Sequence, residues 1–530
     1  MNKPPKPWET AFQLAWLQAS SAQFEAFLES CKNISEIYRT DDEALIEVGR
    51  LLVDFGFLSR ARWCFETVSH RNREDMRAEL HLANLALIEG DHINAQKKYK
   101  ALQLVLPENS IIKRNLLLSQ QYDPTLSYED RLKSARSWGK WAISRAGGIK
   151  TRPAKRRITA SESMPLKIGY VSSDFCQHTV GLFVKNIIQQ HSRNLIANEG
   201  NSVEVFAYSS GRISDWVTEE IKRYSKFKDV SSLDDKSLVD IIQKDKIDFL
   251  VDLSGHTAGS RLTAFAYRAA PVQVSWLGYF ATTGLSYIDA VLLDKWHAPL
   301  GTEIQFTEEI FHLHNGRLNY QPVPWAPEVS PAPCLKNGFI TFGCFNNTSK
   351  LNSGVFDVWS RVLQAVPNSR LILKWRTFAD EKFSNSIFDT FAHIGIDPNR
   401  IELRKASFHA DLLQEYQHLD IALDPFPFTG GLTSCESLWM GVPIVTLPQQ
   451  NVVSRQTYAI LNAIGFPDWA ATTTAQYISI AKLLASNPEQ LQSFRDSLRN
   501  HMRSSALMDT IKFTQELEAA FHDIYHKFSQ

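Results

Sequence analysis

Three groups of residues in this chain have types and spacings suited to chemistry on a phosphate-bearing ligand. The first is Gly430-Gly431, which follows an apolar strand-like run and precedes a short helical pattern. Glycines permit positive φ and a close backbone approach, and a helix N-terminus offers amide groups and a positive dipole end to a phosphate. Thr433 or Ser434 can cap this helix. The spacing of Thr433 and Glu436 equally fits a capping box, in which both side chains only satisfy the helix itself.

The second group is a single lysine and the third is a pair of histidines. Lys350 follows the strand-like run 339–344, where an ammonium group is suited to neutralising a diphosphate. Alone it fits a solvated surface lysine, but together with the glycines a diphosphate site explains both. His178 and His256 follow two earlier strand-like runs, and histidine acts as a base or a donor near neutral pH. Taken singly, each histidine is better explained as a side chain that satisfies backbone groups in a turn than as a catalytic group.

Metal-binding patterns are weak in this sequence. The α/β part has no Asp-x-Asp pair, so Lys350 and the helix N-terminus would take the place of a metal on the diphosphate. The six cysteines are far apart and form no Cys-x-x-Cys pair, which argues against zinc and dithiol sites. We therefore expect no metal and no bound cofactor, and we interpret the cysteines as small buried side chains of a protein in a reducing cytosol.

Alternating strands and helices must position these residues. Strand-like runs occur first at 167–171, 203–208, 247–253, 272–276 and 290–293, and later at 339–344, 370–374, 401–403, 421–423 and 444–446. Helical patterns lie between them, and two or three more run from about 474 to 528. This alternation predicts two parallel sheets with right-handed crossovers. Ligands of such sheets gather at the carboxyl ends of the strands, which is where the distinctive residues fall.

The first part of the chain has a different pattern, with apolar residues at helical spacing over residues 8 to about 145. A 34-residue repeat pairs Gly56 with Gly90, Ala61 with Ala95 and Phe65 with Tyr99. This period and its small residues resemble the tetratricopeptide repeat, and two units are clear. A groove for protein partners and a purely structural extension are equally consistent with it.

These patterns divide the 530 residues into several predicted parts. They are an all-α domain at 1–147, a basic linker at 148–165 (Lys150, Arg152, Lys155, Arg156, Arg157), an α/β lobe at 166–320, a proline-rich linker at 321–338, a second α/β lobe at 339–510 and a final helix at 511–530. Lys+Arg and Asp+Glu balance at 57 each, so no electrostatic footprint for nucleic acid is present. No apolar run is long enough to cross a bilayer and no signal-peptide core opens the chain, so we expect a cytoplasmic protein.

Several motifs in order, over about 165–525, resemble glycosyltransferase family 41, which includes protein O-GlcNAc transferases and SPINDLY-type protein O-fucosyltransferases. The motifs are GYVSSDF at 169–175 with His178, DLSGHT at 252–257, APVQ at 270–273 leading to WLGY at 276–279, FGCFNN at 342–347 with Lys350, VPNSRL at 366–371 and the run 424–446. The resemblance implies a GT-B fold behind the helical repeats, with metal-independent, inverting sugar transfer to Ser or Thr hydroxyls of proteins.

The same resemblance implies roles for individual residues. Lys350 matches the lysine that stabilises the leaving diphosphate, and His178 matches the active-site histidine of the first lobe. The positions matched to the donor nucleotide are Asn347, Gly430, Gly431, Thr433 and Glu436, the last at the ribose. Gly278, Tyr279 and Thr283 match the loop beside the donor sugar, and His256 is expected on that side as well.

The donor is less closely specified than the reaction. Leu432 stands where many relatives carry threonine, and the base-recognition region 405–415, with His409 and Asp411, aligns poorly with the animal enzyme. We expect UDP-GlcNAc, with a GDP-fucose protein O-fucosyltransferase as the alternative in the same class. A non-catalytic repeat scaffold with degenerate sugar-nucleotide lobes is the alternative of another class, and retention of Lys350, His178, Gly430 and Glu436 argues against it.

Overall fold

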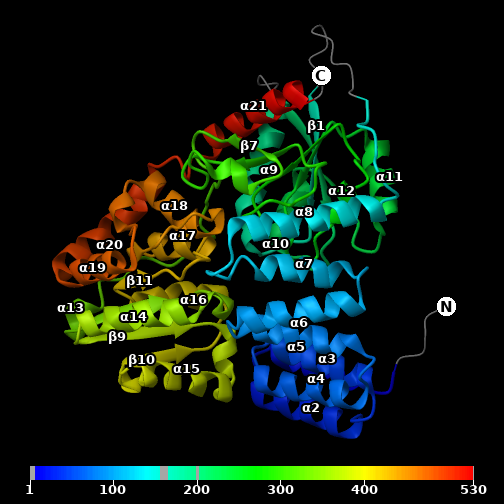
Figure 1. Ribbon diagram of the computed structural model, residues 1–530. Helices are drawn as coiled ribbons and strands as arrows, with labels where there is room; N and C mark the ends of the chain where they lie inside the picture. Colours follow the sequence, from blue (N-terminus) through cyan, green and yellow to red (C-terminus); the bar gives the residue numbers. More distant parts are fainter. Residues whose placement is uncertain (1–5, 155–164, 198–201, 529–530) are drawn as a thin grey trace. The chain divides into compact units, whose positions relative to one another are not determined.

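The computed structural model describes residues 6–154, 165–197 and 202–528, which fall into two compact units (Figure 1). The first unit contains the chain up to Asp123 together with Ala332–Pro425 and Ala481–Ser486. The second contains Pro124–Pro331, Phe426–Ile480 and the chain from Asn487 onward. Lys155, Arg156 and Arg157 of the predicted basic linker lie outside the described residues, and the predicted domain boundaries stay predictions.

Helices α1 to α7 open the first unit and pack as successive hairpins. Those of α3 with α4 and α5 with α6 carry the predicted 34-residue repeat. The repeat positions Ala61, Ala95, Phe65 and Tyr99 are all fully buried, as expected for residues at which paired helices touch. The helices are α1 (Glu9–Ser20), α2 (Phe24–Ile37), α3 (Asp42–Asp54), α4 (Leu58–Arg71), α5 (Met76–Ile88), α6 (His92–Val105) and α7 (Ser110–Ser119).

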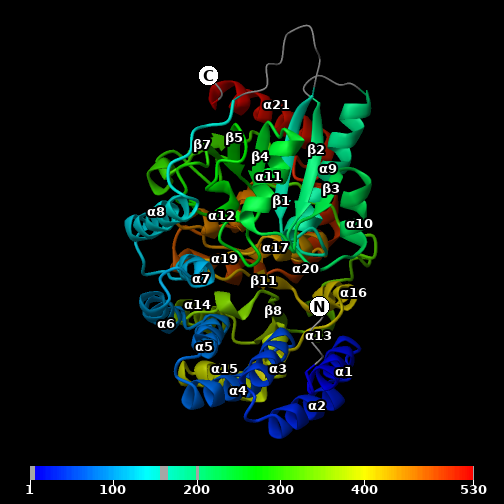
Figure 2. The same ribbon diagram turned by 90° about the vertical axis from the view of Figure 1, so that its right-hand side faces the viewer.

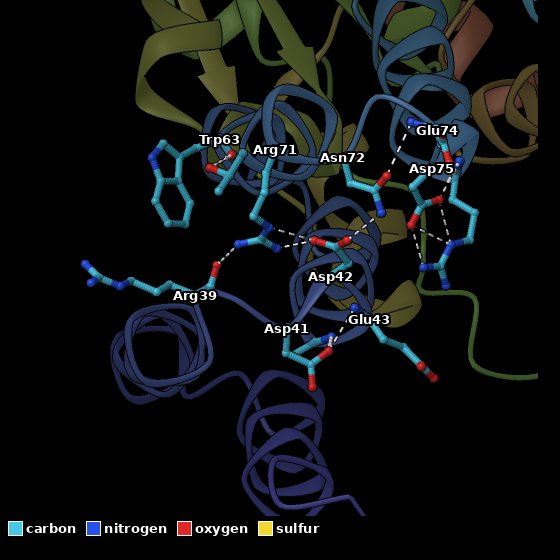
Figure 3. Close-up of polar contacts among 12 residues, drawn as sticks. Arg39, Asp41, Asp42, Glu43, Trp63, Arg71, Asn72, Glu74 and Asp75 are labelled. Atoms are coloured by element: carbon cyan, nitrogen blue, oxygen red, sulfur yellow. Dashed lines mark hydrogen bonds and ion pairs between the residues drawn. The ribbon is translucent and has the colours of Figure 1, made fainter.

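Polar side chains join the ends of neighbouring repeat helices (Figure 3). Asp41 caps α3 by accepting hydrogen bonds from two amide groups of its first turn, at 3.0 and 3.1 Å. Asp42 accepts from Nε of Arg71 and from Nδ2 of Asn72, each at 3.0 Å, where α4 ends. The start of α3 is therefore fixed both by its own cap and by the end of α4.

The first unit also holds four parallel strands in the order β10-β9-β8-β11. The central strand β8 is buried throughout because it has neighbours on both sides. The four strands are β8 (Ile340–Cys344), β9 (Ser369–Lys374), β10 (Ile401–Arg404) and β11 (Ile421–Leu423). The helices of this part of the unit are α13 (Cys334–Asn337), η2 (Thr348–Lys350), α14 (Ser353–Ala365), η3 (Arg376–Ala379), α15 (Glu381–His393), η4 (Pro398–Arg400), α16 (His409–Glu415) and η5 (Tyr416–His418).

The second unit is built on a seven-stranded parallel sheet in the order β3-β2-β1-β4-β5-β6-β7. The five predicted strands of this region are present, and two edge strands, β3 and β7, are additional. The strands are β1 (Leu166–Ser172), β2 (Val203–Ser209), β3 (Lys226–Asp229), β4 (Phe249–Asp252), β5 (Val272–Ser275), β6 (Ala290–Leu293) and β7 (Glu309–His312). Parallel order with helical crossovers is the predicted α/β pattern.

Helices cover this sheet, and two of them share a buried polar contact. The first is α9 (Thr179–Ala197) and the second is α21 (Thr510–Phe528), both beside β1 in Figure 2. His191 of α9 lies 3.0 Å from the hydroxyl of Tyr170 and 2.8 Å from the Glu518 carboxylate of α21. Phe521 packs on Phe249 at 4.7 Å between ring centroids. The C-terminal helix is thus part of the core of this unit.

The remaining elements of the second unit connect the strands or follow the sheet. They are α8 (Tyr128–Arg145), α10 (Trp216–Arg223), α11 (Asp235–Asp245), α12 (Leu262–Phe265), η1 (Thr302–Gln305), α17 (Leu432–Trp439), β12 (Ile444–Val445), η6 (Val452–Arg455), α18 (Gln456–Ile464), η7 (Pro467–Trp469), α19 (Thr474–Ala485), whose residues from Ala481 on belong to the first unit, and α20 (Pro488–Arg503). No helix of the described residues is long and apolar enough to cross a membrane.

Candidate active site

The loop that carries Lys350 leaves the carboxyl end of β8, and we name residues 345–351 the lysine loop. Nζ of Lys350 donates a hydrogen bond to Oδ1 of Asn346 at 2.8 Å. Burial lowers the pKa of Lys350 to about 8, while the nearby Asp424 and Cys344 oppose that shift. Asp424 directly follows β11, the strand that pairs with β8. Two neighbouring strand ends therefore hold one ammonium group, which is still mostly charged at neutral pH.

Asn346 and Asp424 lie within the motif at 342–347 and the run 424–446, and the sequence alone predicts no role for either of them. Asn347, the neighbour predicted to contact the nucleotide, accepts a hydrogen bond from the amide of Ser349 at 3.0 Å and so caps η2. Its oxygen shapes the loop, and the predicted nucleotide contact stays a prediction.

Backbone of the helical repeats meets the lysine loop within the first unit. A Cβ on Gly90, which has φ +85°, would lie 2.1 Å from the carbonyl oxygen of Leu351. The hydroxyl of Thr348 donates to the carbonyl oxygen of Ile88 at 2.9 Å. The other repeat glycine, Gly56, has φ +89° and would place a Cβ 2.0 Å from the carbonyl oxygen of Arg376, after β9. Both repeat turns are thus in contact with loops at the strand ends.

The glycine run lies in the second unit, just before α17, and we name residues 428–431 the glycine loop. Gly431 is the N-cap residue of α17, with φ −124°, and neither Gly430 nor Gly431 is among the positive-φ residues of the described chain. The expectation of positive φ is therefore wrong. A Cβ on Gly431 would lie 3.1 Å from Oε1 of Gln456, a tight contact with the end of a flexible side chain.

The predicted capping of α17 is wrong as well. The helix begins at Leu432, so Thr433 and Ser434 lie inside its first turn, and the described structure gives it no side-chain cap. The hydroxyl of Ser434 is instead 2.7 Å from that of Thr457, which donates to the carbonyl oxygen of Gly430 at 3.1 Å. Glu436 is buried on α17. The first turn of α17 thus keeps the character of an anion-binding helix N-terminus.

The two histidines of the first sheet differ in exposure. His178 precedes α9, and its side chain is 50% exposed, with Nδ1 3.8 Å from a carboxylate oxygen of Asp174. His256 is buried, and its Nε2 donates to the carbonyl oxygen of Thr283 at 2.8 Å. Its ring also packs edge-on against Tyr279 at 5.2 Å between centroids. His178 is thus available to a ligand, whereas the contacts of His256 favour support of the loop that carries Thr283.

That loop follows β5, and we name residues 276–284 the tyrosine loop. Gly278 is recessed, because a Cβ there would lie 1.8 Å from the carbonyl oxygen of Leu253. The amide of Thr283 donates to the buried Glu308 carboxylate at 2.7 Å, and the hydroxyl of Thr282 donates to it at 2.6 Å. The hydroxyl of Thr283 also contacts Glu308. Sequence reasoning missed Glu308, because nothing local marks it as the partner of a loop 25 residues earlier.

The second unit brings its two sets of predicted residues together. Phe280 of the tyrosine loop packs edge-on against Phe428 of the glycine loop, with 5.4 Å between ring centroids. The loop with Gly278, Tyr279 and Thr283 is therefore adjacent to the loop that leads into Thr433 and Glu436. Asn347 and Lys350 belong to the first unit, and their proximity to the glycine loop stays a prediction. Among the described residues, no group of three or more His, Cys, Asp or Glu is arranged to hold a metal ion.

Two parallel sheets with loops of this kind at the carboxyl ends of their strands place the chain among the α/β proteins that bind ligands at this edge of the sheet. The profile of glycosyl transferase family 41 matches residues 123–318 and 333–517. The chain therefore belongs to glycosyltransferase family 41. The predicted fold class, a GT-B α/β fold preceded by tetratricopeptide-like helices, is confirmed.

Individual relatives agree with this assignment. The chain is 34% identical over 436 residues, 81% of its length, to the Oryza sativa subsp. japonica protein named "Probable UDP-N-acetylglucosamine--peptide N-acetylglucosaminyltransferase SPINDLY". It is 36% identical over 370 residues, 69% of its length, to the Solanum lycopersicum protein of the same name. These matches cover 46% and 39% of the two relatives, so the chain spans less than half their length. A solved lysine-to-methionine mutant of Thermobaculum terrenum O-GlcNAc transferase superposes with a TM-score of 0.87 at 29% identity, over 99% of both chains.

Proposed function

We propose that this chain is a cytoplasmic, inverting, metal-independent glycosyltransferase that moves GlcNAc from UDP-GlcNAc to Ser or Thr hydroxyls of proteins. The names of the relatives support the donor and the protein acceptor. The helical repeats are an expected surface for that acceptor. In the reaction, the bond from the anomeric carbon to the phosphate oxygen breaks as the hydroxyl oxygen bonds the opposite face of that carbon. The hydroxyl proton is lost and UDP departs.

The observation that carries this proposal is the ammonium group at the ends of β8 and β11. Lys350 is enclosed with Asn346 and Asp424 and keeps a charge at neutral pH. Negative charge grows on the departing diphosphate as the glycosidic bond breaks, so a fixed cation is worth more in the transition state than in the ground state. The expected partner in this task is the first turn of α17 with Gly430, Gly431 and Thr433.

The other predicted residues divide into nucleotide and sugar roles. Asn347 and Glu436 are proposed to hold the nucleoside, and the tyrosine loop, with Gly278, Tyr279 and Thr283, to border the sugar. His178 is half exposed beside Asp174, which suits a group that accepts or relays the hydroxyl proton. His256 is proposed to support the sugar side indirectly, through its bond to Thr283.

A ligand screen tests the donor. A ligand that binds only the folded state raises the unfolding midpoint, so UDP is expected to do so more than GDP at equal concentration. Hydrolysis of UDP-GlcNAc without acceptor and incorporation of labelled GlcNAc into a Ser/Thr peptide library are expected to accompany it. Stabilisation by GDP with transfer from GDP-fucose would replace the donor assignment, and no response to either nucleotide would favour the scaffold alternative.

A further inference from the structure

A buried arginine outside the predicted site holds the tyrosine loop by its backbone. Arg317 follows β7 and is 1% exposed. Its Nη2 donates to the carbonyl oxygens of Leu277 and Tyr279, at 2.8 and 2.6 Å. The indole of Trp276 returns a hydrogen bond to the carbonyl oxygen of Arg317 at 3.2 Å. One side chain thus fixes the carbonyl groups of the two residues on either side of Gly278.

This arrangement is costly in the interior of a protein. Nε and Nη1 of Arg317 have no hydrogen-bond partner among the residues that the structure describes, and burying a guanidinium removes its hydration. Burial lowers the pKa of Arg317 to about 10, against the attraction of Asp294, so the group is charged at neutral pH. Asp294 is itself 2.7 Å from the Arg317 amide and 2.8 Å from His297. Because burying this charge costs hydration free energy, we infer that Arg317 contributes more than packing.

The loop above Arg317 needs support for a physical reason. Leu277 has φ +69°, a left-handed conformation that a leucine adopts only under constraint from its surroundings. Hydrogen bonds from Arg317 to the carbonyl oxygens of residues 277 and 279 supply that constraint. Without them, the recessed position of Gly278 and the direction of Tyr279 would relax.

The guanidinium also reaches the glycine loop through two aromatic rings. It lies over the ring of Phe280 at 5.2 Å from the centroid, within the range of a cation–π contact. Phe280 in turn packs on Phe428 at 5.4 Å. Arg317, the tyrosine loop and the glycine loop therefore form one contiguous packed set within the second unit.

We propose that Arg317 is a positioning residue for sugar transfer, which sets the tyrosine loop and, through Phe280 and Phe428, its distance from the glycine loop. The inference rests on the proposed function of these loops. It assigns Arg317 no contact with the donor. Its expected effect is on the geometry of the reacting sugar, where a displacement of about 1 Å costs on the order of a hundredfold in rate.

Arg317→Lys tests this with a closely matched control, Arg268→Lys. Arg268 is also buried, lies 3.4 Å from a carboxylate, that of Asp289, and covers an aromatic ring, that of Tyr287, at 5.0 Å. It belongs to the opposite, amino edge of the same sheet, because Asp289 directly precedes β6. A lysine at 317 lacks the planar guanidinium that reaches both carbonyl oxygens through Nη2 and covers the ring of Phe280, so only this variant is expected to release the tyrosine loop.

The readout separates rate from binding in the full chain. Arg317→Lys is expected to lower kcat for GlcNAc transfer about tenfold to a hundredfold. Calorimetry with UDP is expected to give an unchanged number of sites per chain and a Kd within about twofold of wild type, because the nucleotide contacts lie elsewhere. Arg268→Lys is expected to leave both quantities within about twofold. Phe280→Leu, which removes the ring between the two loops, is expected to lower kcat by a few-fold with UDP binding retained.

Two results would overturn the positioning role. One is an Arg317→Lys protein with wild-type kcat, and the other is a loss of kcat matched by an equal loss of UDP sites. If Arg317→Lys does not fold, Phe280→Leu decides, and a wild-type kcat for that variant rejects the proposal. A wild-type chain that neither binds UDP nor transfers GlcNAc would instead reject the proposed function, which distinguishes the two failures.

Discussion

The lysine loop and the tyrosine loop both leave a buried parallel strand, yet different interactions hold them. Uncharged backbone contacts with the helical repeats, at Gly90 and Thr348, support the lysine loop. Buried charged groups support the tyrosine loop, with Arg317 on its carbonyl oxygens and Glu308 on its amide and hydroxyl groups.

This difference follows from what each loop is proposed to do. A cation that stabilises a departing diphosphate must keep its charge available, and ion pairs in its support would compete with the ligand. Asp424 attracts Lys350, while the hydrogen bond of its Nζ goes to the neutral amide of Asn346. The tyrosine loop offers shape instead of charge, so the ions that hold it can bind its backbone and hydroxyl groups.

Lys350→Ala is expected to have the largest effect. Loss of a preorganised charge at the leaving group lowers kcat by about 10²–10³-fold in comparable sites, so transfer should fall by that order. The unfolding midpoint is expected to stay at or above that of wild type, because a desolvated charge is removed. Rates of UDP-GlcNAc hydrolysis and of transfer, with thermal unfolding beside them, measure both. Lys336→Ala, at an exposed lysine of the same unit, is the control; wild-type rates at Lys350→Ala would refute the diphosphate role.

Glu308→Gln tests the charged support of the tyrosine loop. The Glu308 carboxylate accepts hydrogen bonds from the hydroxyl of Thr282 at 2.6 Å and from the backbone amide of Thr283 at 2.7 Å. In the glutamine variant the side-chain NH2 group would face one of these two donors, and that hydrogen bond would be lost. Leaving buried hydrogen-bonding groups unsatisfied costs about 1–3 kcal/mol each, so the second unit should unfold at a lower temperature.

Glu309→Gln, one residue later, is the matched control because its side chain is 45% exposed. It is expected to change stability by less than about 0.5 kcal/mol. Equal midpoints for the two variants, measured by scanning calorimetry, would contradict a supporting role for Glu308.

Gly90→Ala tests the neutral support of the lysine loop. Left-handed backbone costs a non-glycine residue about 1–2 kcal/mol, and the new Cβ would also meet the carbonyl oxygen of Leu351 at 2.1 Å. Gly148→Ala is the control, because Gly148 has φ +87° with no atom within 4 Å of the added carbon. Both variants are expected to show the cost of a left-handed alanine. Only Gly90→Ala is expected also to lower kcat several-fold, as measured by a transfer assay. A pair of variants with the same kcat would show that the repeat turn does not position Lys350.

Central strands could be predicted from the sequence, whereas edge strands could not. β1 and β8 are apolar runs buried on both faces, which is the strongest signal a strand gives. β3 reads Lys226–Asp229 and β7 reads Glu309–His312, and both are polar and partly exposed because an edge strand has a neighbour on one side only. Composition alone does not separate such segments from loops.

The candidate site shows the same limit at the level of side chains. Lys350 and the glycine run could be predicted from the sequence, because a lysine or a pair of glycines directly after a strand indicates a phosphate site without knowledge of distant residues. Arg317 could not, since its partners lie 38 and 40 residues earlier and only the folded sheet brings them together. Helix α8 is a further case, because a Cβ on Gly139 would lie 2.0 Å from the carbonyl oxygen of Gly284, which assigns this helix to the second unit's packing.

The pH dependence of transfer gives the most specific test of the charge at Lys350. Its pKa is lowered to about 8, so the ammonium group is lost above that pH, and kcat/KM should fall about tenfold per pH unit on the alkaline side. The effect on stability has the opposite sign. The unfolded chain binds this proton up to about pH 10.4, so between about 8 and 10.4 this residue makes folding more favourable as pH rises.

A fall in rate above pH 8 without loss of folded protein therefore identifies titration and excludes unfolding. In Lys350→Arg the guanidinium stays charged throughout this range, so the alkaline limb should vanish on a lower plateau, because the planar group does not reproduce the hydrogen bond to Asn346. Initial rates from about pH 6.5 to 10, with circular dichroism at each pH, supply the measurement. If the fall in rate above pH 8 persists in Lys350→Arg, another group causes it. The proposal that neutral support keeps the charge of Lys350 available to the diphosphate would then be contradicted.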